Sequence, residues 1–184
     1  TTATSDHQMN IGNIIYGNDE YSESKIGNVG IGFNDPKTVL DVHHSGSDLS
    51  SMADDTGGGE VVYFGTVTED DVCAAGKLMY LHTDQRWYSV DADAVARGGY
   101  QLLGICLGTT PATHGMLIRG FFDFRSYISG AFAIGMPCYV SEDIGKIDFT
   151  APSASGDYIR VVGYGTTTAN VIYFNPSQTW VELS

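Results

Sequence analysis

The chain has 184 residues, of which 22 are acidic and nine are basic, so its formal net charge at neutral pH is −13. A charge of this sign excludes binding to nucleic acid or to an anionic membrane surface through a broad basic face. Charged residues make up only 17% of the chain, whereas aromatic residues reach 11% and there are 23 glycines. This composition favours an all-β protein punctuated by glycine turns over a helical bundle or a disordered chain.

The negative charge is concentrated in the N-terminal part. Residues 1–75 hold 13 acidic and two basic side chains, a net charge of −11, whereas residues 76–184 hold nine acidic and seven basic, a net charge of −2. This asymmetry predicts two parts with different roles. We expect a thin segment over residues 1–45, a glycine-rich linker over 46–60 and a larger β domain over 61–184.

Short apolar segments alternate with Gly and Asn in the first 45 residues. The tetrapeptide Ile-Gly-Asn-Ile at 11–14 recurs as Ile-Gly-Asn-Val at 26–29. This pattern predicts strands of three or four residues, which bury too little surface to be stable alone. We therefore expect several copies of the chain to pack around one axis, with their acidic groups pointing outward. The oligomerisation residues expected at this axis are Ile11, Ile14, Ile26, Val29, Ile31, Leu40 and Val42.

The segment 26–36, taken together with Leu-Asp-Val at 40–42, resembles a motif of phage tail fibres and related virion fibre proteins. In that family a Gly-Asn-Val-Gly-Ile-Gly core, at 27–32 in this chain, precedes a polar turn with proline and then a short strand. The resemblance implies a homotrimeric fibre shaft in a virion that is assembled in the host cytoplasm. It also implies contacts with other virion proteins.

Residues 61–184 are dense in strand signals. The candidate strands are 61–64, 77–81, 101–107, 116–124, 136–140, 159–163 and 171–174, and turn residues such as Gly98-Gly99 and Ser129-Gly130 separate them. Many short strands at this spacing predict a β-sandwich or a barrel-like head. The run Phe-Phe-Asp-Phe at 121–124 further predicts a strand buried on both faces, either in the centre of a sandwich or at a contact between subunits.

A weak internal duplication runs through this head at an offset of 59 residues. The identical pairs are Gly76 and Gly135, Tyr80 and Tyr139, Asp84 and Asp143, Ala92 and Ala151, and Gly104 and Gly163. Apolar positions follow the same offset, as in Leu102-Leu103 and Val161-Val162. The offset predicts two equivalent strand-turn-strand units in one pseudo-symmetric β module.

The head as a whole is similar to C-terminal modules of marine-phage structural proteins and to small β modules of phage head-decoration proteins. The similarity rests on segments such as Gly-Ile-Cys-Leu-Gly at 104–108, Gly-Met-Pro-Cys-Tyr-Val-Ser at 135–141 and Ile-Tyr-Phe-Asn-Pro-Ser at 172–177. It implies a virion protein and leaves the location in the particle open.

No motif for catalysis or metal binding stands out. The chain has no Gly-x-Ser-x-Gly elbow, no P-loop and no His-Glu-x-x-His. Cys73, Cys106 and Cys138 form no Cys-x-x-Cys pair, so we expect buried thiols. Asp91 and Asp93 could act as the two acids of a glycosidase, but they head a predicted helical turn, where Asp serves as a cap. We predict no catalytic residue, no metal and no cofactor.

The segment most suited to recognition is a hairpin at Asp84-Gln85-Arg86-Trp87-Tyr88. Trp and Tyr offer a sugar an apolar face and hydrogen bonds, while Asp and Arg can fix hydroxyl or carboxylate groups. Because Lys146 stands at the duplicated position of Trp87, the repeat itself requires no aromatic residue there. The predicted ligand-binding residues are Asp84, Arg86, Trp87 and Tyr88; the alternative is that Trp87 packs in the domain or against a neighbouring subunit.

Together these patterns predict an all-β, non-enzymatic virion protein with a short fibrous shaft and a β head. The leading hypothesis is a homotrimeric tail-fibre subunit that attaches to a host surface glycan or receptor, with no binding to nucleic acid and no membrane insertion. One alternative is a capsid or baseplate decoration protein or a head fibre. A glycan depolymerase is the least favoured.

Overall fold

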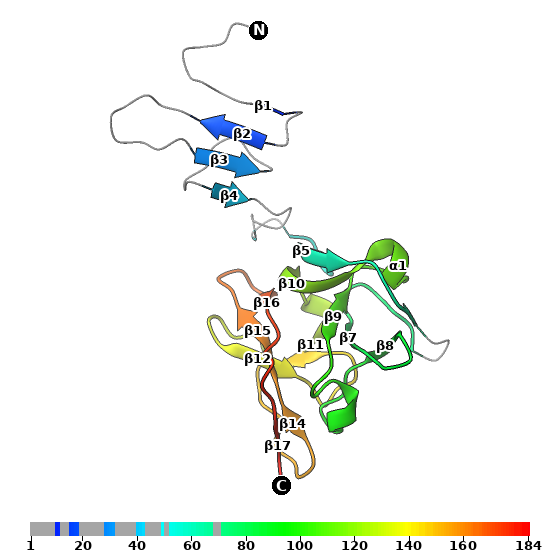
Figure 1. The fold of residues 1–184 in the computed structure, drawn as a ribbon. Coiled ribbons are helices and arrows are strands. Elements are labelled where there is room, and N and C mark those ends of the chain that lie inside the picture. The colour runs from blue at the N-terminus through cyan, green and yellow to red at the C-terminus, as the bar shows by residue number, and fades with distance from the viewer. Residues whose placement is uncertain are drawn as a thin grey trace, which may run out of the picture. The chain divides into compact units, whose positions relative to one another are not determined.

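The computed structural model describes residues 10–11, 15–18, 28–31, 40–42, 49, 52–67 and 71–184. It divides the chain into two compact units, Thr1–Ser47 and Asp48–Ser184. The described elements are almost all strands, joined by short helical turns (Figure 1). The prediction of an all-β protein is therefore confirmed.

The first unit contains a sheet of four short strands. They are β1 (Asn10–Ile11), β2 (Ile15–Asn18), β3 (Asn28–Ile31) and β4 (Leu40–Val42), and they lie side by side in that order. The pairs β1–β2 and β2–β3 are antiparallel, whereas the pair β3–β4 is parallel. Two of the predicted oligomerisation residues, Ile14 and Ile26, lie outside the described residues.

The second unit is built on a sheet of eleven strands, ten of which form one continuous path. Its order is β11-β13-β12-β15-β16-β10-β9-β7-β8-β6, and β5 pairs with β10 beside this path. The strands are β5 (Gly57–Val62), β6 (Thr66–Val67), β7 (Leu78–Leu81), β8 (Arg86–Ser89), β9 (Leu103–Cys106), β10 (Met116–Asp123), β11 (Ile128–Ser129), β12 (Pro137–Val140), β13 (Ile147–Asp148), β15 (Val161–Gly165) and β16 (Val171–Phe174).

Smaller elements complete this unit. Strands β14 (Tyr158–Ile159) and β17 (Val181–Glu182) form a separate antiparallel pair. The helical turns are η2 (Val95–Arg97), α1 (Pro111–His114) and η3 (Arg125–Tyr127). Each spans a single turn, so they connect strands and add no layer to the fold.

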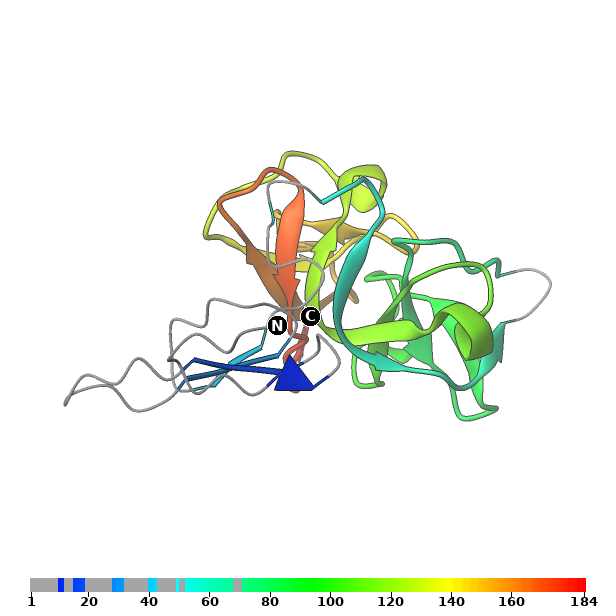
Figure 2. The same cartoon turned by 90° about the horizontal axis from the view of Figure 1, so that it is seen from above.

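Strand β10 lies in the middle of the path and joins its two halves, the first made of β6 to β9 and the second of β11, β12, β13, β15 and β16. One of its edges pairs with β5, while the other pairs with β9 at Met116–Leu117 and with β16 at Gly120–Asp123. The strands of the first half and those of the second half lie on opposite sides of β5 and β10 in Figure 2. Phe122 and Phe124 are fully buried in the main core, whereas Phe121 is only partly buried. Strand β10 is a central strand because both of its edges are paired, but the predicted burial of both of its faces is not confirmed.

The 59-residue duplication is visible in the hydrogen bonds of the two halves. The N–H of Gly76 donates to the carbonyl of Cys106, and that of Gly135 donates to Gly165, both at 2.9 Å. In the return direction Cys106 donates to Lys77 and Gly165 donates to Met136, both at 3.0 Å. Strand β7 corresponds to β12 residue for residue. The predicted pair of equivalent units is therefore confirmed.

The core lies between the two halves. It combines Leu78, Tyr80, Leu103 and Ile105 of the first half with Val140, Ile147, Val162, Ile172 and Phe174 of the second. Side chains from both ends of the path thus share one core, as the layers of a β-sandwich do. A second, smaller cluster covers the other face of β7, where Trp87 packs with Cys73, Met79, Cys106 and Met116.

The predicted linker is wrong at its C-terminal end, because residues 57–60 belong to β5. Glycine disfavours strands in general, but close approach of two backbones requires it here. A Cβ on Gly59 would lie 2.2 Å from the carbonyl oxygen of Arg119, and one on Gly120 would lie 2.2 Å from that of Gly58. Both glycines have a positive φ, near 150°. The glycine run therefore allows β5 to pack against β10.

Candidate functional site

The predicted recognition segment forms the turn between β7 and β8. The N–H of His82 donates to the carbonyl of Arg86 at 2.9 Å and closes the turn, in which Gln85 has a φ of 70°. Asp84 organises this turn through its carboxylate, which accepts hydrogen bonds from the Tyr88 hydroxyl at 2.8 Å and the Arg86 N–H at 3.1 Å. It also lies 3.0 Å from the imidazole Nδ1 of His82.

These contacts favour the ionised form of Asp84. Desolvation opposes ionisation, but the hydrogen bonds from Tyr88 and His82 outweigh it and hold the pKa of Asp84 below its usual value. The same bond to Asp84 raises the pKa of the Tyr88 phenol. At neutral pH the turn therefore presents a carboxylate whose two oxygens are already engaged.

Trp87 does not belong to a binding surface. Its side chain is fully buried, and its indole N–H donates to the carbonyl of Phe64 at 2.9 Å. Side chains alternate between the two faces along β8, so Trp87 points into the smaller core cluster while Arg86 remains exposed. The prediction that Trp87 offers its ring to a ligand is therefore corrected, and the alternative of packing within the domain holds.

The turn borders a cleft of about 720 Å³, which we call the hairpin cleft. Its lining includes Phe64, Leu81, His82, Asp84, Gln85 and Arg86. Two of the four predicted ligand-binding residues, Asp84 and Arg86, thus line a cleft. Tyr88 instead stacks on Tyr80 with ring centroids 5.9 Å apart, which supports the turn from behind.

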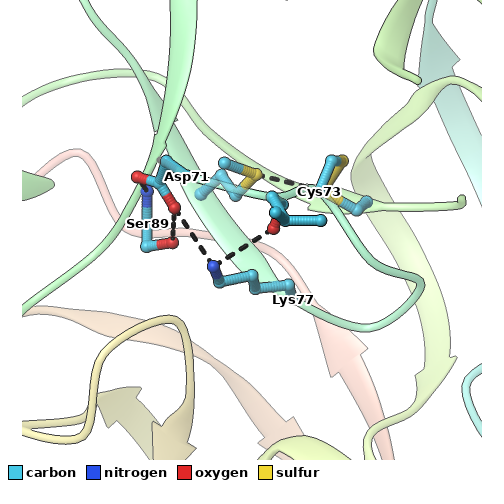
Figure 3. A network of polar contacts seen from close by, with 7 residues as sticks. Asp71, Cys73, Lys77 and Ser89 are labelled. Atoms are coloured by element: carbon cyan, nitrogen blue, oxygen red, sulfur yellow. Dashed lines mark hydrogen bonds and ion pairs between the residues drawn. A yellow bond between two sulfur atoms is a disulfide. The ribbon is translucent and has the colours of Figure 1, made fainter. Parts of the chain in front are cut away.

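Behind this hairpin, a polar network fixes the segment before β7 (Figure 3). The carboxylate of Asp71 accepts hydrogen bonds from the Ser89 N–H at 2.6 Å, from the Ser89 hydroxyl and from the Lys77 ammonium at 3.1 Å. Desolvation would raise the pKa of Asp71, but the bonds from Ser89 and Lys77 outweigh it and lower that pKa. The network serves structure, since Ser89 is buried.

The cysteine prediction is wrong for two of the three residues. Cys73 and Cys106 form a disulfide across 33 positions of sequence, which ties the Asp71 segment to β9 (Figure 3). Cys138 is a buried free thiol as predicted, and burial raises its pKa to about 12. Three cysteines with no paired spacing gave no indication of which two would meet.

The two carboxylates considered for glycosidase chemistry have different surroundings. Asp91 is buried, accepts the N–H of Asp93 at 3.1 Å and pairs with Nη1 of Arg97 at 2.6 Å, whereas Asp93 is exposed. Asp91 thus caps the turn that leads into η2, although the residue at the N-cap of η2 itself is Ala94. The prediction is thus right that Asp91 caps a turn and wrong that this turn is the helical one, which begins at Val95.

A second cleft lies where the two halves meet, and sequence reasoning missed it. It measures about 480 Å³, and its lining includes Glu60, Tyr100, Leu102, Arg119, Arg160 and Gln178. We call it the Arg160 cleft. One signal in the sequence points to it: at the 59-residue offset Arg160 corresponds to Gln101, and both line the cleft. The duplication therefore places two equivalent positions in one cleft. The first holds a neutral residue, Gln101, and the second holds a cation, Arg160.

Three clefts of the second unit differ in charge. Arg119 and Arg160 against Glu60 give the Arg160 cleft a formal charge of +1. The hairpin cleft is balanced by Asp84 and Arg86. A third cleft of about 180 Å³ is lined by three acids, Glu142, Asp143 and Asp148, with no basic residue. Within the ranges that the structure describes, no cluster of His, Cys, Asp or Glu could hold a metal ion.

The sheet of the first unit separates apolar from polar positions. Its register aligns Ile11, Ile15, Ile31 and Val42 in one row across all four strands. Val29 and Leu40 are paired in the next row of the same face, because each stands two residues away from a member of the first row. The opposite face carries the row Asn10, Tyr16, Gly30 and Asp41.

Comparisons of this chain with known protein families, with curated proteins and with solved structures find no match. Among the described helices, none is long and apolar enough to cross a membrane. The functional argument therefore depends on the chain's own residues.

Proposed function

We propose that this chain is a non-enzymatic structural protein of a phage particle, a homotrimeric tail-fibre subunit. Its first unit forms the contact between three chains, and its second unit is the head that attaches to the host surface. The fibre-like motif at 26–42 and the run of short strands in the first unit support this assignment.

The observation that carries the proposal is the apolar row across the first sheet. Five of the seven predicted oligomerisation residues are in described strands, and all five fall on one face: Ile11, Val29, Ile31, Leu40 and Val42. Asp41 falls on the other face, as expected if acidic groups point away from a shared axis. One apolar face on so small a sheet is stabilised when copies of it pack together.

The second unit supports an adhesive role more than a catalytic one. Three of its carboxylates are engaged in ion pairs: Asp91 with Arg97, Asp71 with Lys77, and Asp143 with Lys146. Its two larger clefts instead combine aromatic rings with hydrogen-bonding side chains on a framework of paired strands. Binding sites that recognise surface ligands need such rigid support and no reacting group.

The trimer is tested on the purified chain by size-exclusion chromatography with light scattering. Three copies per particle are expected. Ile31→Asp places a charge on the apolar face and should yield monomers, whereas Asn28→Asp adds the same charge to the same strand on the opposite face and should leave the trimer intact. A wild-type chain that is monomeric at micromolar concentration would contradict the proposal.

A second test concerns location. Electron microscopy of the particle with an antibody against the second unit should label the tips of tail fibres. Label on the capsid shell would instead favour the decoration protein.

One observation favours that alternative: Phe121, Tyr173 and Tyr164 align across β10, β16 and β15 on the outer face of the sheet, where Tyr164 is 48% exposed. A partly exposed aromatic row can dock onto a shell.

A further inference from the structure

The Arg160 cleft contains a buried cation that no acid neutralises. The Arg160 side chain is buried, with 6% of the residue exposed, and it comes from the link between β14 and β15. Its Nη1 donates to the carbonyls of Gly98 and Gln101, both at 2.7 Å, and its Nε donates to Ser177 at 2.9 Å. In the described part of the chain, no carboxylate lies within ion-pair distance of it and no acceptor lies on Nη2.

Such an arrangement is unusual for a structural arginine. Buried charges in proteins are normally paired with an opposite charge, because backbone carbonyls carry only partial charges. Burial lowers the pKa of Arg160. The ordinary pKa of a guanidinium is so high that the group still keeps its charge at neutral pH. Arg160 lines the cleft, and its described hydrogen bonds use Nε and Nη1, so Nη2 is the donor that we assign to a ligand.

Two further features of the cleft suit a ligand with an anionic group and a ring. Arg119 on β10 is exposed, and its Nε is held by the Tyr173 hydroxyl at 2.9 Å, which leaves its outer nitrogens toward solvent. Tyr100 is 62% exposed and is backed by Trp180, with ring centroids 6.2 Å apart. A tyrosine ring supported in this way offers a flat apolar surface beside two guanidinium groups.

We propose that the Arg160 cleft binds a carboxylated sugar residue of a surface glycan, with the carboxylate between Arg160 and Arg119 and the sugar ring on Tyr100. This inference rests on the proposed attachment function and assigns it to a site and a ligand class. Guanidinium groups recognise a planar carboxylate through paired N–H donors. The amides of Asn175 and Gln178 and the carboxylate of Glu60 line the same cleft and bind sugar hydroxyls.

The charge of the chain restricts where an anionic ligand can bind. A protein with a net charge of −13 repels acidic glycans at long range, so binding requires a local positive site. Of the three clefts compared above, the Arg160 cleft is the one with a positive formal charge. Its two cations come from separate segments, Arg119 from β10 and Arg160 from the link between β14 and β15.

The inference is tested by isothermal titration of the full chain with a galacturonic acid trimer, a neutral galactose trimer and glucose 6-phosphate. The uronate is expected to bind, to weaken as salt increases and to bind at least tenfold tighter than either of the others. Arg119→Ala and Tyr100→Ala, which remove exposed side chains, should each reduce the affinity roughly tenfold. Lys146→Ala, which removes a cation elsewhere on the head, should leave it unchanged.

Arg160 itself is tested by Arg160→Lys, which retains the charge and removes the planar pair of donors. We expect at least a tenfold loss of uronate affinity in a protein with an unchanged circular dichroism spectrum. If this variant does not fold, Arg119→Ala and Tyr100→Ala decide the question. Equal affinity for all three sugars would overturn the inference. Equal uronate affinity of the wild type and these two variants would also overturn it. If the chain forms trimers and is located at fibre tips but does not bind uronates, this inference is overturned while the proposed function stands.

Discussion

The two halves of the second unit have the same hydrogen-bond framework, but different residues occupy its equivalent positions. In the first half Trp87 fills a core cluster, and the equivalent Lys146 of the second half is a surface side chain that pairs with Asp143. Gln101 uses its amide to hold the backbone of the first half, and the equivalent Arg160 reaches across to Gln101. The duplicated backbone sets where strands pair, and the differences between equivalent residues set where a ligand can bind.

Stabilising contacts are also distributed unequally between the halves. The first half holds a disulfide and the network of Asp71, Lys77 and Ser89. In the second half the positions equivalent to Asp71 and Lys77 are Gly130 and Met136, which cannot form such a network. We conclude that the first half depends on specific crosslinks and the second half on its share of the common core.

The largest difference between the halves is expected at Trp87 and Lys146. Trp87→Ala should lower the free energy of unfolding by roughly 3–5 kcal/mol, because it leaves a cavity and an unpaired carbonyl at Phe64. Lys146→Ala, at the equivalent position, should change it by no more than about 0.5 kcal/mol. Urea unfolding followed by fluorescence and circular dichroism measures both values. Similar losses in the two variants would refute the distinction between core and surface.

The disulfide should have the next largest effect. Replacing Cys73 and Cys106 by serine should cost about 3 kcal/mol, since a crosslink over 33 positions restricts the unfolded chain. Cys138→Ser removes a buried free thiol of the second half and should cost less. Thermal unfolding with and without a reductant provides the measurement. A melting temperature that does not respond to reductant in the wild type would show that the crosslink does not contribute.

The smallest effect is expected from Asp71, and it depends on pH. The pKa of Asp71 is lowered in the folded state, so its contribution is present above the unfolded pKa near 4 and is lost as pH falls through the folded value. Asp71→Asn should therefore lower stability at pH 7 by about 1 kcal/mol, after allowance for solvent screening, and by less at pH 3. Urea unfolding at both pH values tests this. An equal loss at both would assign the effect to packing.

Much of the fold could be predicted from local patterns. Strand β16 has the predicted limits, and β7, β9, β10 and β12 lie within one or two residues of theirs. These strands have apolar runs bounded by turn residues, so short-range sequence determines them. The first residues of β5 were missed because their glycines are explained only by a partner strand about 60 residues away, which no local pattern indicates.

The candidate site was predicted only in part. The hairpin was located correctly, and Asp84 and Arg86 do line a cleft. Trp87 was misassigned because the polar residues around it suggested a surface turn, whereas the alternation of β8 turns it inward. Arg160 sits in the apolar sequence Tyr-Ile-Arg-Val-Val, which does not show what surrounds a cation. Its role follows from carbonyls of three distant residues, and only the folded chain brings these together.

The pairing of β5 with β10 has a mechanical consequence. A pull that reaches the second unit along the chain from the first unit enters through β5, at its N-terminal end. When such a pull acts along the strand axis, the rungs of the ladder lie across the load, so the bonds from Thr56–Asp123 through Val62–Met116 bear it together. Shear of this kind resists force better than opening a ladder rung by rung. The glycines that let β5 approach β10 therefore help to hold β5 in the second unit under load.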